Sequence, residues 1–181
     1  MREKFMRQIQ QLLLIFFFLC INSTGLALER TALPKGLLPL SANPAPTTVL
    51  KDMDGEPYRL AENKGAWVFV HFWASWCGPC IKEMPAIQKM TEILQPEGLK
   101  IALINTAEDE DTVFSFLSTY APSLRPLMDR DGQVTEKWQP RGLPATYLVD
   151  PEGRVRFQAL GGRDWDTPSY VAFLRQLMTS Q

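Results

Sequence analysis

The sequence contains few residues that bind metals: one histidine and three cysteines in 181 residues. A structural zinc site needs four ligands, usually from two Cys-x-x-Cys pairs or from one pair and two histidines. Cys20 lies in an N-terminal apolar run, which leaves Cys77, Cys80 and His71 for the rest of the chain. These three ligands are too few for zinc, and the sequence predicts no metal site.

The chain also lacks an excess of basic charge. Its formal net charge is −1, and residues 1–27 carry a net charge of +2, so the remainder stands at about −3. Without a basic stripe, nucleic acid is not an expected partner. With 45% hydrophobic and 22% charged residues and no internal repeats, the composition suits one packed domain rather than a disordered chain.

No apolar run reaches the roughly 20 residues that span a bilayer. Three basic residues precede the apolar run 12–21, and Gly25 and Ala27 follow it at the positions that a signal peptidase reads. We therefore expect residues 1–27 to be a cleaved signal peptide. An uncleaved membrane anchor and lipid attachment at Cys20 are the alternatives. In each case the folded part is exported across a bacterial inner membrane, so the expected location is the periplasm, either soluble or tethered through the N-terminus.

The rest of the chain divides at a proline-rich segment. Residues 28–46 contain four prolines without steady periodicity and are expected to form a linker or extended arm, followed by a domain over 47–181. Two short strands, 47–50 and 58–60, are expected to form a hairpin across Asp54-Gly55.

The remaining pattern alternates strands and helices. Strands are expected at 67–73, 99–105, around Leu127, 146–149 and 155–160, and helices at 81–94, 111–120, 134–138 and 169–178. In the helix 111–120, Phe114 is expected to face inward with Val113, Phe116 and Leu117. This order predicts an α/β domain in which a mixed sheet carries helices on both faces.

Cys77 and Cys80 form a Cys-x-x-Cys pair that has three possible uses. Metal binding lacks ligands, and a purely structural disulfide across so short a loop removes little entropy from the unfolded chain. The third use is redox exchange. Cys77 falls where a strand ends and a helix begins, because Pro79 favours a helix's first turn. A helix N-terminus stabilises a thiolate and lowers its pKa, so Cys77 can attack a disulfide. Cys80, one turn later and more buried, can then resolve the mixed disulfide.

These residues carry a family resemblance. The segment 76–80, Trp-Cys-Gly-Pro-Cys, matches the active site of thioredoxin. The segments 72–77 and 83–85, the leading hairpin and the export signal are similar to the TlpA/ResA/DsbE (CcmG) group of periplasmic or membrane-anchored thiol-disulfide oxidoreductases. The resemblance covers residues 44–178. It implies a thioredoxin fold with an added N-terminal β-hairpin, and a redox-active disulfide between Cys77 and Cys80 in place of any cofactor.

The resemblance also implies a surface for binding substrates. It predicts a cis peptide bond before Pro144, with Leu143 and Pro144 pairing with the bound substrate chain. Trp76 is expected to shield the nucleophile and contact the substrate together with Gly78 and Pro79. Simple packing is the alternative role for Trp76.

Two further residues are candidates for proton handling. Glu83 matches the acidic position of the family's Cys-x-x-Cys-x-x-Glu pattern, which is implied to tune the cysteines and move protons. The alternative is a solvated glutamate on the helix surface. His71 departs from the family, because thioredoxin has aspartate at this strand position and the TlpA group often has asparagine. A histidine there could accept the proton of Cys80, whereas the alternative is a core histidine that bonds a backbone carbonyl.

The pair Gly78-Pro79 is the dipeptide of reducing thioredoxins, whose potential lies near about −270 mV. This dipeptide predicts a reductant. The family resemblance implies that its clients are exported proteins, such as apocytochrome c or a copper-site protein, and that a membrane electron donor of the DsbD/CcdA type recharges it. We expect the protein to be a monomer. A disulfide oxidase or isomerase is the alternative. A copper metallochaperone would lack its third ligand, because no histidine follows Cys80. A peroxidase would use a lone cysteine. The distinctive segment 161–166 has no mechanism from sequence.

Overall fold

The computed structural model describes residues 33–179, and the predictions for residues 1–27 lie outside them. The strands are β1 (Leu37–Pro44), β2 (Val49–Asp52), β3 (Pro57–Arg59), β4 (Val68–Trp73), β5 (Lys100–Thr106), β6 (Pro126–Asp129), β7 (Ala145–Val149) and β8 (Arg154–Leu160). The helices are α2 (Gly78–Leu94), α3 (Glu110–Tyr120), α4 (Gln133–Trp138) and α5 (Pro168–Thr179), with a 3₁₀ turn at Leu60–Asn63. Over these residues, none of the helices combines the length and the apolar character that a membrane crossing requires.

The strands form one mixed sheet in the order β1-β8-β7-β4-β5-β6-β2-β3. β4 runs parallel to β5 and antiparallel to β7, and β5 runs parallel to β6. β2 and β3 form the predicted hairpin at one edge. Because parallel neighbours end at the same edge of a sheet, the segments that follow β4 and β5 come side by side.

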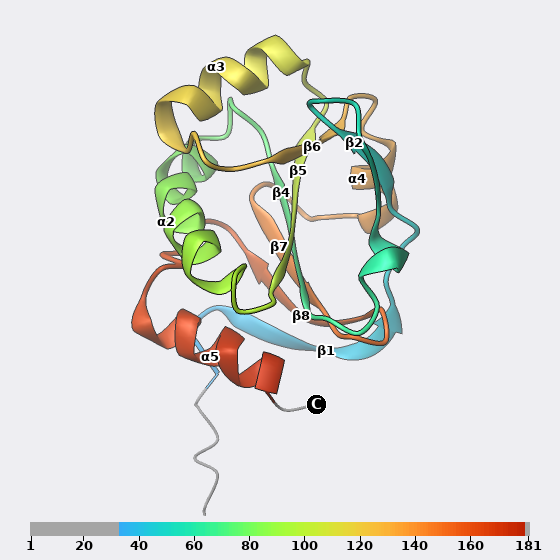
Figure 1. Ribbon diagram of the computed structural model, residues 1–181, viewed down its shortest axis with the longest axis vertical. Coiled ribbons are helices and arrows are strands. Elements are labelled where there is room, and N and C mark those ends of the chain that lie inside the picture. The colour runs from blue at the N-terminus through green and yellow to red at the C-terminus, as the bar shows by residue number, and fades with distance from the viewer. Residues whose placement is uncertain (1–32, 180–181) are drawn as a thin grey trace, which may run out of the picture. The chain divides into compact units, whose positions relative to one another are not determined.

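Helices cover both faces of the sheet, as the sequence predicted (Figure 1). The alternation of side chains along β4 assigns its residues to two cores. Phe69 and Trp73 join the core under α2, α3 and α5, whereas Val70 and Phe72 join the core under α4. All six residues of β4 are buried, because the strand lies in the middle of the sheet with helices above and below. His71 shares the face of Phe69 and Trp73, which places it beneath α2.

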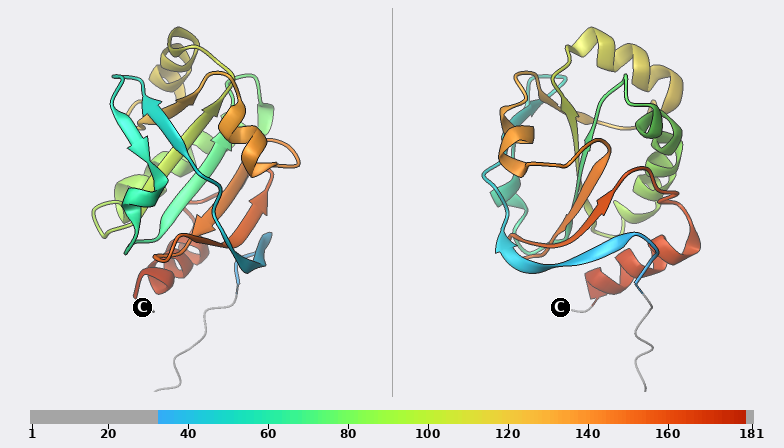
Figure 2. Two further views of the ribbon diagram at one scale, coloured as in Figure 1. Left: turned by 90° about the vertical axis from the view of Figure 1, so that its right-hand side faces the viewer. Right: turned by 180° about the vertical axis from the view of Figure 1, so that it is seen from behind.

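Two sequence-based expectations are wrong. Residues 37–44, expected within a linker or extended arm, form β1, which pairs antiparallel with β8 (Figure 2). Prolines are tolerated there because β1 is an edge strand, which needs ladder hydrogen bonds on one side only. Phe114, expected to face inward, is exposed, while Val113, Phe116 and Leu117 are buried.

Candidate active site

Cys77 lies at the N-terminus of α2, directly after the turn that leaves β4. It is the N-cap residue of the helix, and its sulfur accepts a hydrogen bond of 3.3 Å from the backbone N–H of Cys80. Pro79 occupies the first turn of the helix, as predicted. The sulfur therefore sits at the positive end of the helix, where unpaired N–H groups stabilise a thiolate.

The two cysteines form a disulfide and differ in accessibility. Cys77 is 6% exposed and Cys80 is fully buried, so Cys80 is the more buried of the two thiols, as predicted. The surface around Cys77 is open, because Gly78 and Pro79 are exposed. Trp76 is 70% exposed, so it is not a core residue, and an indole of this size beside the nucleophile is available to a partner.

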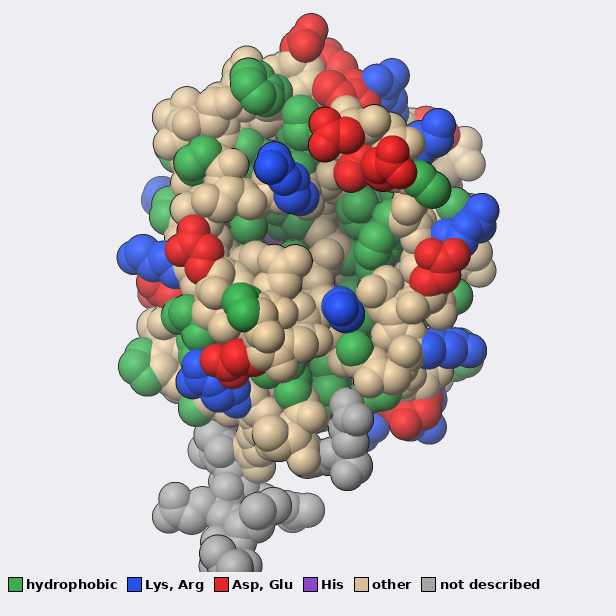
Figure 3. All heavy atoms as spheres, in the orientation of Figure 1, with side chains coloured by type: hydrophobic (Ala, Val, Ile, Leu, Met, Phe, Trp, Pro, Cys, Tyr) green, Lys and Arg blue, Asp and Glu red, His purple; other side chains and the backbone are tan. Residues whose placement is uncertain are grey.

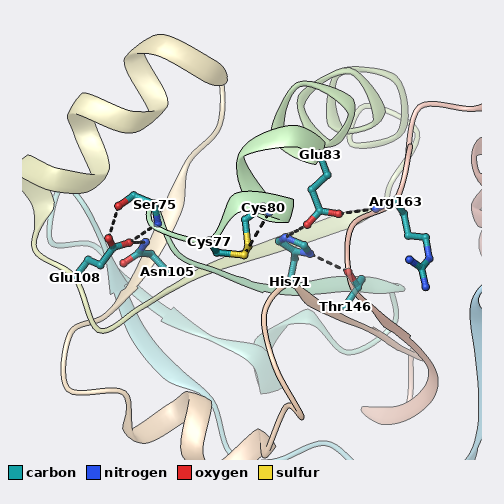
Figure 4. Close-up of a disulfide and its surroundings, with 9 residues drawn as sticks. All are labelled: His71, Ser75, Cys77, Cys80, Glu83, Asn105, Glu108, Thr146 and Arg163. Carbon is teal, nitrogen blue, oxygen red and sulfur yellow. Dashed lines mark hydrogen bonds and ion pairs between the residues drawn. A yellow bond between two sulfur atoms is a disulfide. The ribbon is translucent and has the colours of Figure 1, made fainter.

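A carboxylate and an imidazole meet under the helix. Oε1 of Glu83 lies 3.2 Å from Nε2 of His71, and both side chains are buried. The interpretation of Glu83 as a solvated surface residue is therefore wrong. Figure 4 shows Glu83 pointing from α2 toward the His71 ring, with the disulfide beside them.

The other ring nitrogen of His71 also has a partner. Nδ1 is 2.8 Å from the hydroxyl of Thr146, its cross-strand neighbour on β7. No backbone carbonyl is involved, in contrast to the alternative drawn from sequence. A threonine hydroxyl both donates and accepts, so it can bond Nδ1 whether that nitrogen carries a proton or not. The ring can therefore change protonation state without losing this partner.

The segment 161–166, which had no explanation from sequence, supports Glu83. The backbone N–H of Arg163 donates a hydrogen bond of 2.9 Å to Oε2 of Glu83. Gly162 makes this approach possible, because a Cβ there would lie 3.2 Å from the carbonyl oxygen of Pro79. Trp165 is fully buried and packs edge-on against Phe69, with ring centroids 4.8 Å apart.

The guanidinium of Arg163 holds this segment in place. It donates hydrogen bonds to four backbone carbonyls, at 2.7 Å to Gly162, 2.8 Å to Leu160, and 3.4 Å to each of Gly161 and Gly36. The turn before β1 is thereby tied to the segment that supports Glu83. A cavity of about 480 Å³ opens at this point and is lined by Glu83, Lys35, Lys82, Arg163 and Tyr170 among others.

The peptide bond between Leu143 and Pro144 is cis, as the resemblance predicted. Pro144 is buried and Leu143 is partly buried at the start of β7. The carbonyl oxygen of Pro144 accepts a hydrogen bond of 2.8 Å from the N–H of Gly161, which connects this bend to the 161–166 segment. Their role in pairing with a substrate chain stays a prediction.

Sequence reasoning missed Thr146 and Arg163. The register of an antiparallel neighbour would have pointed to Thr146 once β4 and β7 were paired. For Arg163 the signal was weaker, namely the Gly161-Gly162 pair that permits a close backbone approach. Across residues 33–179 no group of three or more His, Cys, Asp or Glu side chains is arranged to hold a metal ion.

Taken together, the described side chains provide a thiol pair at a helix N-terminus and a buried acid–base pair beside it. This combination suits reversible disulfide exchange, in which one thiolate attacks and a second thiol must lose its proton before it can resolve.

The model of the AhpC/TSA family matches residues 42–158. Over 111 residues the chain is 35% identical to the thiol-disulfide oxidoreductase ResA of Bacillus subtilis, covering 61% of this chain and 62% of that protein. Over 128 residues it is 34% identical to ResA of Geobacillus thermodenitrificans, covering 71% and 70%.

A solved structure agrees with these relatives. A thiol:disulfide interchange protein of the DsbE type from Chlorobium tepidum is 27% identical and superimposes with a TM-score of 0.65, over 76% of this chain and 94% of that one. The predicted thioredoxin fold and the resemblance to the ResA and DsbE group are both confirmed.

Proposed function

The chain belongs to the AhpC/TSA family, and from its cysteine pair we infer that it is a thiol-disulfide oxidoreductase that works by dithiol–disulfide exchange. The observation that carries this inference is the position of Cys77 as the N-cap of α2, with Cys80 buried one turn later. A pair that served only to stabilise the fold would have no need of a helix N-terminus at one sulfur.

The exchange proceeds in two steps. The Cys77 thiolate attacks one sulfur of a client disulfide, so that a mixed disulfide forms and the second client sulfur leaves as a thiolate. Cys80 then loses its proton and attacks the sulfur of Cys77, which releases the other client sulfur as a thiolate. The client gains two electrons, and the Cys77–Cys80 disulfide is the oxidised product.

His71 and Glu83 are proposed to take the proton of Cys80 in the second step. Support comes from their position beneath the start of α2 and from the 3.2 Å contact between them. Thr146 pairs with Nδ1 in either protonation state, and Glu83 borders a cavity through which a proton can pass to solvent. The proton is returned when the pair is reduced again.

The proposed direction of electron flow is toward the client. Gly78-Pro79 is the dipeptide of reducing thioredoxins. Together with the N-terminal signal pattern, it favours a periplasmic protein that reduces disulfides in exported proteins. By analogy with the family, cytochrome c or copper-site maturation is the proposed setting, and the protein is proposed to act as a monomer. Such a reductant needs a membrane electron donor of the DsbD/CcdA type. Leu143 and Pro144 are proposed to pair with the client chain, next to the surface formed by Trp76, Gly78 and Pro79.

The direction is tested by the redox potential of the Cys77–Cys80 pair. The protein is equilibrated with glutathione or dithiothreitol buffers, and the fraction of free thiol is measured by alkylation. We expect a value near that of reducing thioredoxins, about −270 mV. A value near or above about −150 mV would reject the reductant and favour an oxidase or isomerase.

The exchange itself is tested with a trapping variant. In Cys80→Ala the mixed disulfide on Cys77 cannot be resolved, so clients remain attached and can be identified by mass spectrometry. Cys77→Ala is the matched control, because it retains one thiol and lacks the attacking one. If the two variants capture the same proteins, the model of attack by Cys77 is wrong.

A further inference from the structure

A second carboxylate lies on the other side of the disulfide from Glu83. β4 and β5 are parallel neighbours, with Trp73 aligned to Asn105, so the turn 74–77 and the segment after β5 emerge side by side. Glu108 belongs to the second segment and reaches across to the first (Figure 4). The proposed mechanism makes no use of it.

Glu108 accepts three hydrogen bonds, two from Ser75 on this turn and one from Asn105 on β5. The backbone N–H of Ser75 donates to Oε2 at 2.8 Å, and the Ser75 hydroxyl donates to Oε1. The side-chain amide of Asn105 donates to Oε2 at 2.7 Å. Ser75 is the residue before Trp76, so the carboxylate holds the backbone immediately ahead of the exposed indole and the nucleophile. Hydrogen bonds to a carboxylate are about twice as strong as those between neutral groups.

The backbone around Glu108 is held in an uncommon conformation. Ala107 has a φ of 60°, in the left-handed region that alanine rarely adopts. Its N–H donates a hydrogen bond of 2.9 Å to the carbonyl oxygen of Asp129, which anchors the bend to β6. Strain of this kind persists where surrounding contacts enforce it, often at functional sites. Here the bend places Glu108 where it can reach Ser75.

We propose that Glu108, oriented by Asn105, is a positioning residue that fixes the turn carrying Trp76 and Cys77 for contact with a protein client. This proposal rests on the proposed function and adds a determinant of client recognition to it. The physical reason is that an exposed indole contributes more to the binding free energy when its backbone is already ordered, since ordering the backbone on binding costs entropy. A small disulfide needs the Cys77 sulfur but no extended surface.

The proposal predicts a difference between two kinds of substrate. In Glu108→Ala the three hydrogen bonds are lost, and we expect KM for the disulfides of insulin to rise about tenfold while kcat changes less than threefold. For a small aromatic disulfide, kcat/KM should stay within about threefold. Asp111→Ala is the matched control, because Asp111 is also acidic and is exposed on α3. Figure 3 shows acidic side chains gathered at the top of the view, the end of the molecule at which Figure 1 draws α3.

A second measurement reports directly on the order of the backbone in the turn 74–77. Hydrogen exchange of the Ser75 amide, followed by NMR in the oxidised protein, should accelerate at least tenfold in Glu108→Ala and remain unchanged in Asp111→Ala. Ser75→Ala removes only the hydroxyl bond and keeps the amide bond, so an intermediate rise in KM is expected. This variant also serves if Glu108→Ala folds poorly.

The outcomes separate this proposal from the function on which it rests. If the wild-type protein reduces neither substrate, the proposed function fails. If it reduces both, and Glu108→Ala loses equal activity toward insulin and the small disulfide, Glu108 is structural and the positioning proposal is overturned. An unchanged exchange rate at Ser75 would overturn it as well.

Discussion

Nε2 of His71 lies 3.2 Å from Oε1 of Glu83, and neither side chain is more than 3% exposed. The two residues come from different elements, His71 from β4 and Glu83 from α2, so the pair connects the helix that begins after Cys77 to the sheet beneath it. Thr146 and the N–H of Arg163 bond the outer atoms of the pair. Four segments of the chain therefore meet at one acid–base pair next to the disulfide.

Removing the acid–base pair should slow the resolving step and change its dependence on pH. In His71→Asn, and separately in Glu83→Gln, we expect the rate of mixed-disulfide resolution to fall about 10²-fold near neutral pH, the scale of one general acid–base contribution. The measurement is the pH–rate profile of single-turnover disulfide reduction. Glu92→Gln is the control, because Glu92 is exposed on the same helix. If the pH–rate profile of His71→Asn matches that of the wild type, His71 does not handle the proton of Cys80.

We expect the hydroxyl of Thr146, rather than the volume of its side chain, to determine its effect on stability and on the pH–rate profile. Thr146→Val keeps the volume but removes the 2.8 Å partner of His71, which leaves a buried ring nitrogen unpaired at a cost of about 1–3 kcal/mol. Thr146→Ser retains the hydroxyl, so it should keep a pH–rate profile like that of the wild type. Urea unfolding and the pH–rate profile distinguish the two variants. Equal profiles in both would mean that the hydroxyl does not influence the ring.

The start of the active site was predictable because its determinants are local. A buried run, a turn and Pro79 after a cysteine specify a strand and a helix N-terminus at Cys77 within about a dozen residues. The order of strands and helices in the domain was predictable for a similar reason. Their hydrophobic periodicities change clearly from one segment to the next.

The supports of the site were not predictable, because they depend on pairing between distant segments. Arg163 lies 80 residues from Glu83, and only the packing of the 161–166 segment brings its N–H to the carboxylate. The burial of Glu83 had a usable signal, since Cys80, Glu83, Met84 and Ile87 share one helical face. The prediction for residues 37–44 was wrong because local signals pointed to a different structure. Their prolines indicate a linker, and only the pairing with the distant strand β8 shows that they form an edge strand.

Asp150 should make the stability of the fold sensitive to acid. Burial raises the pKa of its carboxyl, but hydrogen bonds from the backbone and side chain of Arg154 and from Arg156 outweigh burial and hold the pKa below its usual range. A depressed carboxyl pKa stabilises the native state above the unfolded value, near 3.8, and this contribution is lost as the pH falls through the folded value.

We therefore expect Asp150→Asn to cost roughly 2–3 kcal/mol at pH 7, the scale of hydrogen bonds to a charged group. The difference from the wild type should shrink below pH 3.8. Urea unfolding at a series of pH values measures this, and Asp111→Asn serves as the exposed control. A difference that stays constant down to pH 2 would contradict the assignment.

We expect a side chain at position 36 to destabilise the protein in two ways, through its backbone conformation and through a clash with Arg163. Its φ is 83°, and a Cβ at this position would lie 2.6 Å from a guanidinium nitrogen of Arg163. Gly55 has a φ of 86°, but nothing lies within 4 Å of its Cβ position. Alanine at either site therefore bears the same cost of a left-handed backbone, about 1–2 kcal/mol. Only at Gly36 does it also displace the side chain that holds the segment supporting Glu83.

We expect Gly36→Ala to lose about 1 kcal/mol more stability than Gly55→Ala, because the Arg163 hydrogen bonds to backbone carbonyls are disturbed. The extra loss should disappear in an Arg163→Ala background, where no guanidinium remains to be displaced. Thermal and urea unfolding of Gly36→Ala, Gly55→Ala, Arg163→Ala and the double variant Gly36→Ala/Arg163→Ala give this comparison. Gly36→Ala should also alter the pH–rate profile while Gly55→Ala leaves it unchanged, since only the former reaches Glu83 through Arg163. If both glycine variants behave alike in stability and in pH–rate profile, the turn before β1 has no influence on the active site.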